Sequence, residues 1–148
     1  MRLNLPEYEF NIKKNGETLV IFDSLRKRFV ALTPEEWVRQ NFVRYLIDTR
    51  HFPQALMANE MSIIQNGIKR RCDTVVADHS GQPLMIVEYK APSVEVTQKV
   101  FDQILRYNMV LRARYLTVTN GLRHYCCRID YNRGSHEFLT DIPYYNEL

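Results

Sequence analysis

The sequence has few of the features that would crosslink a protein or anchor it in a membrane. Its 148 residues include only three cysteines, and two of them (Cys126 and Cys127) are adjacent, so no disulfide framework is indicated. The longest apolar runs, such as residues 84–87, are far shorter than the roughly 20 residues of a membrane span. The first ten residues lack the apolar segment of a secretory signal. We therefore expect a cytoplasmic protein with reduced thiols.

Two common functional motifs are also missing. The sequence has no glycine-rich loop of the form G-x-x-x-x-G-K-[ST], so we expect no ATP-driven motor, and no C-x-x-C spacing that would indicate zinc. Hydrophobic residues make up 45% of the chain and charged residues 25%, as in ordinary globular domains, and we treat residues 1–148 as one domain. The net charge is only +3, and the basic clusters at 25–28 and 68–71 are more often solvated faces than binding sites.

The first third of the chain predicts a hairpin and a helix. Residues 8–23 contain two apolar stretches separated by Asn15-Gly16, a favoured hairpin turn. The helix is expected to begin at Thr33, because Thr-Pro-Glu-Glu supplies an N-cap, a proline in the first turn and a capping-box glutamate, Glu36. Apolar residues then recur at helical spacing until about Thr49.

The remainder predicts a meander of three strands, a helix and two further strands. The expected strands are residues 57–65, 68–77, 84–90, 115–119 and 123–130. The expected helix runs from about Ser93 to Arg112, with a buried stripe of Val96, Val100, Ile104 and Leu111, and the tail at 132–148 gives no clear signal. A strand–helix–strand passage after a meander implies an α/β (α+β) fold with a mixed sheet and helices packed on it, the core lying at about 33–130.

Three acidic residues are expected to meet on the meander. If Asn66-Gly67 forms a two-residue turn, Glu60 faces Asp73. A turn centred on 80–81 then places Asp73 opposite Glu88. Facing residues of antiparallel strands lie about 4.5–5.5 Å apart at Cβ. The two hairpins therefore predict a row of three carboxylates on one face of the sheet.

Such a row needs a partner, because like charges directly opposed destabilise a sheet. Mg²⁺ binds a few carboxylate oxygens, keeps several waters and completes its shell with substrate phosphate. Lys90 shares a face with Glu88, where its ammonium can orient an attacking water or stabilise negative charge on a phosphate. The alternative is an ordinary surface strand, in which Arg71 and Lys90 neutralise Asp73 and Glu88 by salt bridges.

The acids and the lysine resemble a known nuclease signature. The run Asp73-x14-Glu88-Tyr89-Lys90, on two adjacent strands after a helix, resembles the PD-(D/E)xK nuclease superfamily, whose core is helix, three strands, helix, strand. Gln103-Ile-Leu-Arg-Tyr107 resembles the Q-x-x-x-Y motif of one branch. The runs TPEEWVRQ, FDQILRYN and TVTNG are similar to the N-terminal nuclease domain of type I restriction enzyme R subunits. This similarity covers residues 20–130 and implies a restriction-endonuclease-like core with an N-terminal β-hairpin.

The resemblance implies a metal site at the end of the third meander strand. Asp73 and Glu88 would bind Mg²⁺ or Mn²⁺, together with the main-chain carbonyl of Tyr89. Lys90 would be the catalytic lysine. One departure from the family pattern is Cys72, which stands where proline often precedes the aspartate.

The resemblance also implies supporting residues on the helices. Gln103 and Tyr107 would position substrate or the lysine, and their spacing places them on one helix face. The glutamate that the family carries on its first helix maps to Glu36, while Glu60 comes from the strand register alone. We rank Glu36 and Glu60 equally as the third acid.

These observations predict a metal-dependent endonuclease-like domain that hydrolyses DNA phosphodiester bonds. The alternative is a non-catalytic nucleic-acid-binding or complex-assembly module that keeps the nuclease fold. Restriction R subunits carry a large helicase motor, which these 148 residues do not encode. DNA is therefore the expected partner, with a separate motor or specificity subunit as a second.

Overall fold

The computed structural model describes residues 2–148 and contains two sheets and two long helices. The first part holds β1 (Ile12–Asn15), β2 (Thr18–Asp23), β3 (Arg28–Ala31) and α1 (Pro34–Asp48). The middle holds β4 (Met57–Gln65), β5 (Ile68–Ala77), β6 (Pro83–Tyr89) and α2 (Gln98–Asn108). The last part holds β7 (Tyr115–Thr119), β8 (His124–Asp130) and β9 (Ser135–Leu139). Single 3₁₀ turns lie at Gln54–Leu56, Met109–Leu111 and Tyr145–Glu147.

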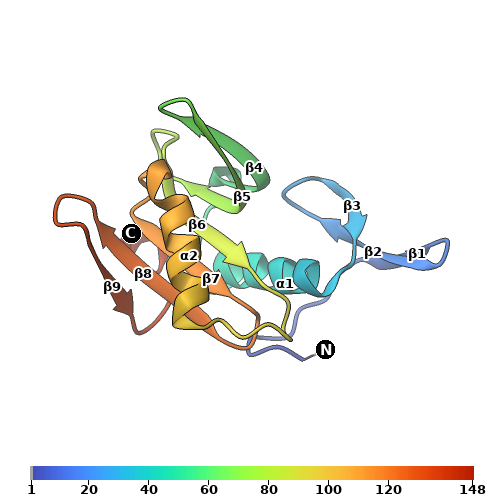
Figure 1. The fold of residues 1–148 in the computed structure, drawn as a ribbon. Helices are drawn as coiled ribbons and strands as arrows, with labels where there is room; N and C mark the ends of the chain where they lie inside the picture. Colours follow the sequence, from blue (N-terminus) through green and yellow to red (C-terminus); the bar gives the residue numbers. More distant parts are fainter. Residues whose placement is uncertain (1) are drawn as a thin grey trace.

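The larger sheet is mixed, as predicted. Its strands follow the order β4-β5-β6-β7-β8-β9, and β6 and β7 pair in parallel while every other neighbouring pair is antiparallel. The parallel step follows from α2, which carries the chain back across the sheet between β6 and β7 (Figure 1). The predicted N-terminal hairpin is present and is extended by β3 into a three-stranded antiparallel sheet.

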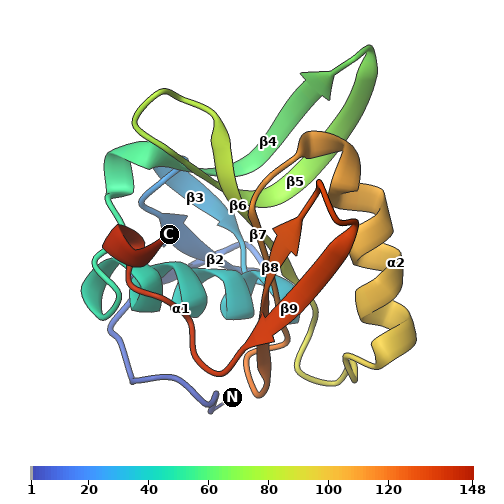
Figure 2. The ribbon, with the colours of Figure 1, turned by 90° about the vertical axis from the view of Figure 1, so that its left-hand side faces the viewer.

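The two helices cover opposite faces of the larger sheet (Figures 1 and 2). Val38, Phe42 and Leu46 of α1 belong to one buried cluster, and Phe101 and Leu105 of α2 belong to the other. Strand β6 alternates between them, because its odd-numbered residues Met85, Val87 and Tyr89 pack with α1 and Ile86 packs on the α2 side. The same alternation directs Glu88 to the α2 side.

Helix α1 begins where the sequence predicts. The Thr33 side chain accepts a hydrogen bond from the Glu36 N–H at 3.0 Å, and the helix ends at Asp48 with Thr49 as its C-cap. The reciprocal half of the expected capping box does not form, because the Glu36 carboxylate binds side chains elsewhere.

Helix α2 is shorter than the predicted span of Ser93 to Arg112. It begins at Gln98 behind the cap Thr97, whose side chain accepts the Val100 N–H at 3.2 Å. The preceding segment is instead a turn, and Asn120 donates to its Val94 carbonyl at 2.8 Å. Of the predicted buried stripe, Val96 and Leu111 are buried, but within α2 the buried positions are shifted by one. Phe101 and Leu105 are buried, whereas Val100 and Ile104 are only half-buried.

The β4–β5 hairpin extends beyond the body of the protein as an arm (Figures 1 and 2). Strands β3 and β9 were not predicted from the sequence, because their residues are mostly exposed and show little alternation. Among residues 2–148, no helix is long and apolar enough to cross a membrane.

Candidate active site

The strand register brings Asp73, in the middle of β5, next to Glu88, near the end of β6. The paired residues of these strands run to Thr74 opposite Val87, so Asp73 and Glu88 come next in register, as the turn arithmetic predicts. Asp73 Oδ2 also accepts the Tyr89 N–H at 2.9 Å. This hydrogen bond fixes one oxygen of the aspartate against the backbone that carries Glu88.

The two half-buried carboxyl groups are close enough to share a hydrogen bond. Burial and the hydrogen-bonded, like-charged neighbour Asp73 raise the pKa of Glu88 to about 9, against weaker opposing effects of Asn108 and Lys90. A carboxyl pair of this kind holds a proton between its oxygens or needs a cation there. The pair therefore has the electrostatic character expected of a divalent metal site.

Lys90 and Glu35 border this pair. The Lys90 N–H donates to the Thr119 carbonyl at 2.9 Å, which ties the end of β6 to β7, and its charge acts on both Glu88 and Glu35. Burial and the charge of Asp73 raise the pKa of Glu35, in the first turn of α1. The helix thus directs Glu35, which the sequence analysis did not select, toward Asp73.

Glu60 does not join the pair, which corrects the predicted row of three acids. The β4–β5 register has the predicted turn, but Glu60 adopts a left-handed backbone with φ 56° and is skipped in the strand pairing. Its carboxylate accepts Arg39 Nη2 at 2.9 Å and Arg71 Nε at 2.8 Å. Burial raises the pKa of Glu60, but the hydrogen bonds from the two arginines outweigh this effect and lower it. Glu60 is already neutralised.

Glu36 is engaged in the same way. Its buried carboxylate accepts Arg26 Nη2 at 2.8 Å, Arg39 Nε at 3.0 Å and Gln40 Nε2 at 2.9 Å. Burial alone would raise the pKa of Glu36, yet these donors lower it. Within residues 2–148, no three His, Cys, Asp or Glu side chains gather closely enough to hold a metal ion. The candidate site is therefore a pair of acids.

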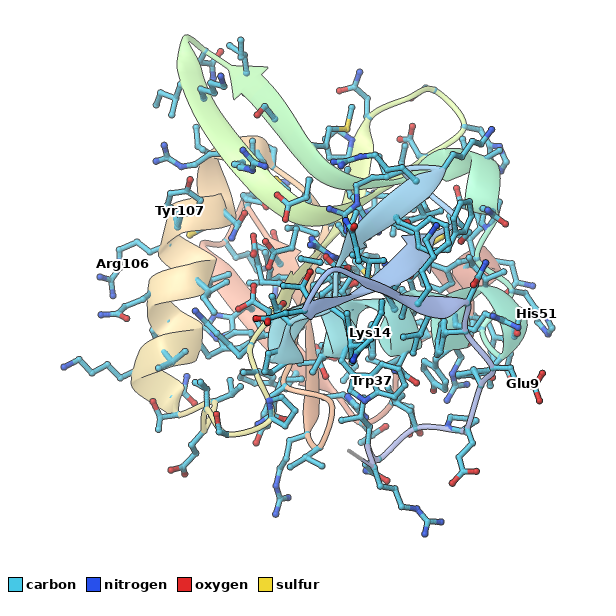
Figure 3. All side chains as sticks on the ribbon, turned by 90° about the vertical axis from the view of Figure 1, so that its right-hand side faces the viewer. Glu9, Lys14, Trp37, His51, Arg106 and Tyr107 are labelled. Atoms are coloured by element: carbon cyan, nitrogen blue, oxygen red, sulfur yellow. The ribbon has the colours of Figure 1, made fainter. Side chains whose placement is uncertain are left out.

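A small hollow of about 190 Å³ lies beside Glu88. Three predicted site residues, Glu88, Gln103 and Tyr107, line it. The rest of the lining is Arg71 of the arm and Ile104 and Asn108 of α2. Tyr107 lies near the end of α2 close to the arm, where Arg70 sits over its ring at 4.4 Å (Figure 3). The structure therefore brings Gln103 and Tyr107 to the same hollow as Glu88.

Asn108 marks the inner end of this hollow. It is 4% exposed and its Nδ2 donates to the Ile104 carbonyl at 2.9 Å. Its Oδ1 is the one buried side-chain oxygen or nitrogen in the described part of the chain without a hydrogen-bond partner. An orphaned acceptor beside Glu88 leaves a place for a donor such as a water or a protonated carboxyl.

Arg39 braces the site from α1. It donates to the Asp73 carbonyl at 3.1 Å while binding Glu36 and Glu60, and its guanidinium lies 5.9 Å from the Tyr89 ring centre. Burial lowers the pKa of Arg39, but the hydrogen bonds that Arg39 donates to the two glutamates outweigh this effect and raise it. One arginine thus joins α1, β4 and β5 next to the acid pair.

A buried hydrogen-bond chain supports the other side of β6. The Tyr89 hydroxyl lies 2.9 Å from Thr74 Oγ1, which donates to Asn59 Oδ1 at 2.6 Å. Asn59 in turn donates to Asp23 Oδ2 at 2.9 Å. The chain of contacts connects the small sheet to the strands that carry the acids, and it fixes Tyr89 between Glu88 and Lys90.

Sequence reasoning missed Glu35, Arg39 and Asn108 as residues of the site. A signal for Glu35 was present, because it stands beside Glu36 in the same helical turn. Successive residues of a helix point about 100° apart, so the choice between them depends on how α1 lies on the sheet. For Arg39 and Asn108 the local sequence gives no comparable signal.

Comparisons with known proteins agree with this fold. Residues 34–143 match the family model described as "Type I restriction enzyme R protein N terminus". A solved fragment assigned to the HsdR subunit of a type I restriction enzyme from Vibrio vulnificus YJ016 is similar, with a TM-score of 0.55 and 21% identity. The match covers 79% of this chain and 24% of that chain, so this chain spans about a quarter of its length. No curated protein sequence gives a significant match.

Proposed function

Because the chain belongs to the family of type I restriction enzyme R protein N termini, we propose that it is a metal-dependent nuclease domain that hydrolyses DNA phosphodiester bonds. The observation that carries this proposal is the contact between the Asp73 and Glu88 carboxyls, with Lys90 just after the end of β6. No arginine among residues 2–148 forms an ion pair with either carboxyl. Glu36 of α1 and Glu60 of β4 instead bind arginines.

Asp73, Glu88 and the Tyr89 carbonyl would hold Mg²⁺ or Mn²⁺. Two carboxylates suffice for such a site, because Mg²⁺ keeps several water ligands. The raised pKa of Glu88 fits this assignment, since a cation relieves the repulsion that raises it. When bound, the metal would polarise a phosphate oxygen and lower the pKa of a water.

The chain's own groups would then orient the substrate and move the proton. Lys90 would stabilise charge on the phosphate or accept the proton of the attacking water. Gln103 and Tyr107 line the hollow beside Glu88 and would position the backbone of the substrate there. As an acid that supports this pair without binding the metal, we propose Glu35 in place of Glu36 and Glu60, because the charges of Asp73 and Lys90 act on it and it forms no ion pair with an arginine among residues 2–148.

The test is cleavage of linear, circular and single-stranded DNA with Mg²⁺ or Mn²⁺, comparing the protein with Lys90→Ala. We expect cleavage that falls at least ~10²-fold in the variant, the scale of losing one transition-state stabiliser. Lys14→Ala, which changes an exposed lysine on β1, is the control and should cleave like the unchanged protein. Equal activity of the protein and Lys90→Ala would overturn the assignment.

A second outcome would favour the non-catalytic module. If neither protein cleaves DNA but the protein still binds it, the fold serves binding or complex assembly, and a separate motor or specificity subunit is the partner to seek. DNA and such a subunit are both part of this proposal.

A further inference from the structure

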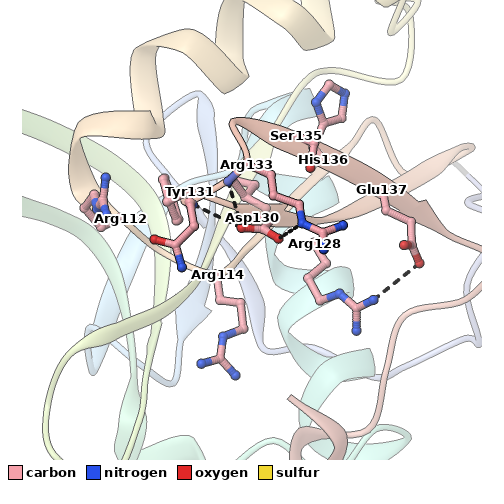
Figure 4. A pocket seen from close by; sticks show the side chains of 11 residues that line it. Arg112, Arg114, Arg128, Asp130, Tyr131, Arg133, Ser135, His136 and Glu137 are labelled. Carbon is pink, nitrogen blue, oxygen red and sulfur yellow. Dashed lines mark hydrogen bonds and ion pairs between the residues drawn. The ribbon is translucent and has the colours of Figure 1, made fainter.

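A large basic cavity lies at the opposite end of β7 from the acid pair. Its volume is about 810 Å³, and it opens between the start of β7, the end of β8 and the start of β9. Four arginines line it together with two acids: Arg112, Arg114, Arg128, Arg133, Asp130 and Glu137. In Figure 4, Arg112 and Arg114 lie on one side of Asp130 and Arg128 on the other. We call it the arginine pocket.

The two acids can balance at most half of the positive charge of the four arginines. Asp130 already accepts the N–H groups of Asn132 and Arg133 in its own turn, at 3.0 and 3.1 Å, and its ion pair with the Arg133 side chain is long at 3.9 Å. Arg128 and Glu137 meet at 3.5 Å, and both side chains are more than half exposed. Ion pairs between exposed side chains are weak, so this pair leaves Arg128 available to another anion. The pocket therefore carries a net of two positive charges.

Arg112 and Arg114 form no ion pair within residues 2–148, yet the segment that carries them is held in place. The Arg112 guanidinium lies 4.5 Å from the centre of the Tyr131 ring, and the Tyr131 hydroxyl donates to the Ala113 carbonyl at 2.5 Å. The Arg114 carbonyl accepts the Ile129 N–H at 2.8 Å. Two free guanidiniums are thus presented on a segment anchored to β8.

We propose that the arginine pocket binds the phosphate backbone of a nucleic acid, as a contact separate from the Asp73–Glu88 site. Guanidinium groups bind phosphate oxygens through paired hydrogen bonds, and all four cations are arginines rather than lysines. The cavity is too large for a single phosphate but suits successive groups of one strand. The choice of DNA as the nucleic acid rests on the proposed function, whereas the phosphate contact does not.

The separation from the acid pair supports a second contact. Val118 of β7 pairs with Glu88, and Arg114 comes four residues before Val118. At about 3.3 Å per residue, the distance between Arg114 and Val118 along the strand is about 13 Å. Duplex DNA advances about 3.4 Å per base pair. The pocket is therefore about four base pairs from the acid pair along this direction, and a bound strand would be held away from the bond to be cut.

The experiment measures DNA affinity without cleavage, in the Asp73→Asn background without divalent metal, using a labelled 20-nucleotide strand and its duplex. Arg112→Gln/Arg114→Gln should weaken binding about 10-fold and reduce the slope of log affinity against log salt by about 1.4–1.8, the value for two phosphate contacts. Arg2→Gln/Arg123→Gln removes the same charge from exposed sites elsewhere and should leave the slope unchanged. Arg114→Gln alone, which leaves the Arg112–Tyr131 contact intact, should reduce the slope by about half as much.

Two results would overturn the proposal. One is an equal loss of affinity in both double variants, which would mean that only total charge matters. The other is equal competition by polyglutamate of matched charge, which would point to an acidic protein as the ligand. Failure of the nuclease assay with an intact pocket effect would reject catalysis and leave this phosphate site standing.

Discussion

The molecule contains two groups of buried or half-buried acids that differ in their neighbours. Asp23, Glu36 and Glu60 each bind at least one arginine side chain, and these bonds lower their pKa values against the effect of burial. Asp73 and Glu88 instead contact one another, and the pKa of Glu88 is raised. The first group behaves as a set of fixed ion pairs that hold the small sheet, α1 and β4 together. In the second group, Asn108 and Lys90 offset the effects of burial and of the neighbouring carboxyl only in part.

This difference separates stability from function. A protein selected only for stability has no reason to place two carboxyls in contact. If the first group is structural, its loss should lower stability without a specific effect on catalysis. If the second group is functional, its loss should abolish catalysis while stability stays about the same.

The largest expected effect is on stability, from Asp23→Asn. The Asp23 side chain is 1% exposed and accepts Leu25 N–H at 2.7 Å, Asn59 Nδ2 at 2.9 Å and the Arg26 side chain. Removing one partner of a buried ion pair costs about 3–5 kcal/mol, and because Arg26 keeps its bond to Glu36 we expect a loss at the lower end of this range. Urea unfolding should show this loss. Asp48→Asn is the control, because its pair with Arg44 is over two-fifths exposed, and it should change the unfolding free energy by less than about 1 kcal/mol.

The lowered pKa of the Asp23 carboxyl also predicts how the free energy of unfolding changes with pH. A carboxyl with a lowered pKa binds fewer protons when folded than when unfolded, so its contribution is present above the unfolded pKa and disappears as pH falls through the folded pKa. The unfolding free energy should therefore fall as pH drops below about 3.8, the ordinary value of Asp23. Asp23→Asn should show a shallower decline, and an unchanged pH profile would contradict the role of this ion pair.

The next effect is on catalysis, from Glu88→Gln. We expect DNA cleavage to fall by at least ~10²-fold, since one of two metal-binding carboxylates is lost. The melting temperature should stay about the same near pH 7, because a pKa raised to about 9 leaves the Glu88 carboxyl protonated there and the amide is its neutral analogue. Glu95→Gln changes an exposed acid before α2 and should have neither effect. A loss of stability as large as that of Asp23→Asn would assign Glu88 to the structural group.

The sequence predicted the position of the Asp73–Glu88 pair, but not which of the other acids bind arginines. Asn66-Gly67 and the cap at Thr33 fix β4, β5 and the start of α1, because turn and cap chemistry are local. The register arithmetic is correct on both sides of Glu60. It cannot reveal that Glu60 itself takes a left-handed backbone, a conformation uncommon outside glycine that here directs its carboxylate toward two arginines.

The start of α2 shows the same limit. Val96 and Val100 have helical spacing, but the chain before Gln98 forms a turn that depends on Asn120. Asn120 follows β7 in the chain and donates to the Val94 carbonyl. Likewise, the choice between Glu35 and Glu36 is decided by how α1 packs against β5. These features depend on contacts between distant segments, which local patterns do not encode.

A smaller effect is expected from the metal itself. Mg²⁺ at ten times its dissociation constant should stabilise the folded protein by about 1.4 kcal/mol, if it binds only that state. This corresponds to roughly 2–6 °C in melting temperature for a chain of this size. Asp73→Asn should show no such rise, and NaCl at matched ionic strength controls for screening. An equal rise in Asp73→Asn would place the metal elsewhere and remove the contrast between the two groups of acids.

The smallest effect is expected from Arg71→Ala, which removes the exposed arginine partner of Glu60. The Arg71 side chain is 70% exposed, and Glu60 keeps its second partner, Arg39, when Arg71 is removed. Exposed ion pairs contribute about 0–1 kcal/mol, so urea unfolding should show a change within that range. Arg39→Gln is the matched comparison, because the same carboxylate then loses its buried partner, and the loss should be several times larger. Equal losses in the two variants would mean that burial does not distinguish the two arginines, and Glu60 would then belong with the solvent-exposed acids.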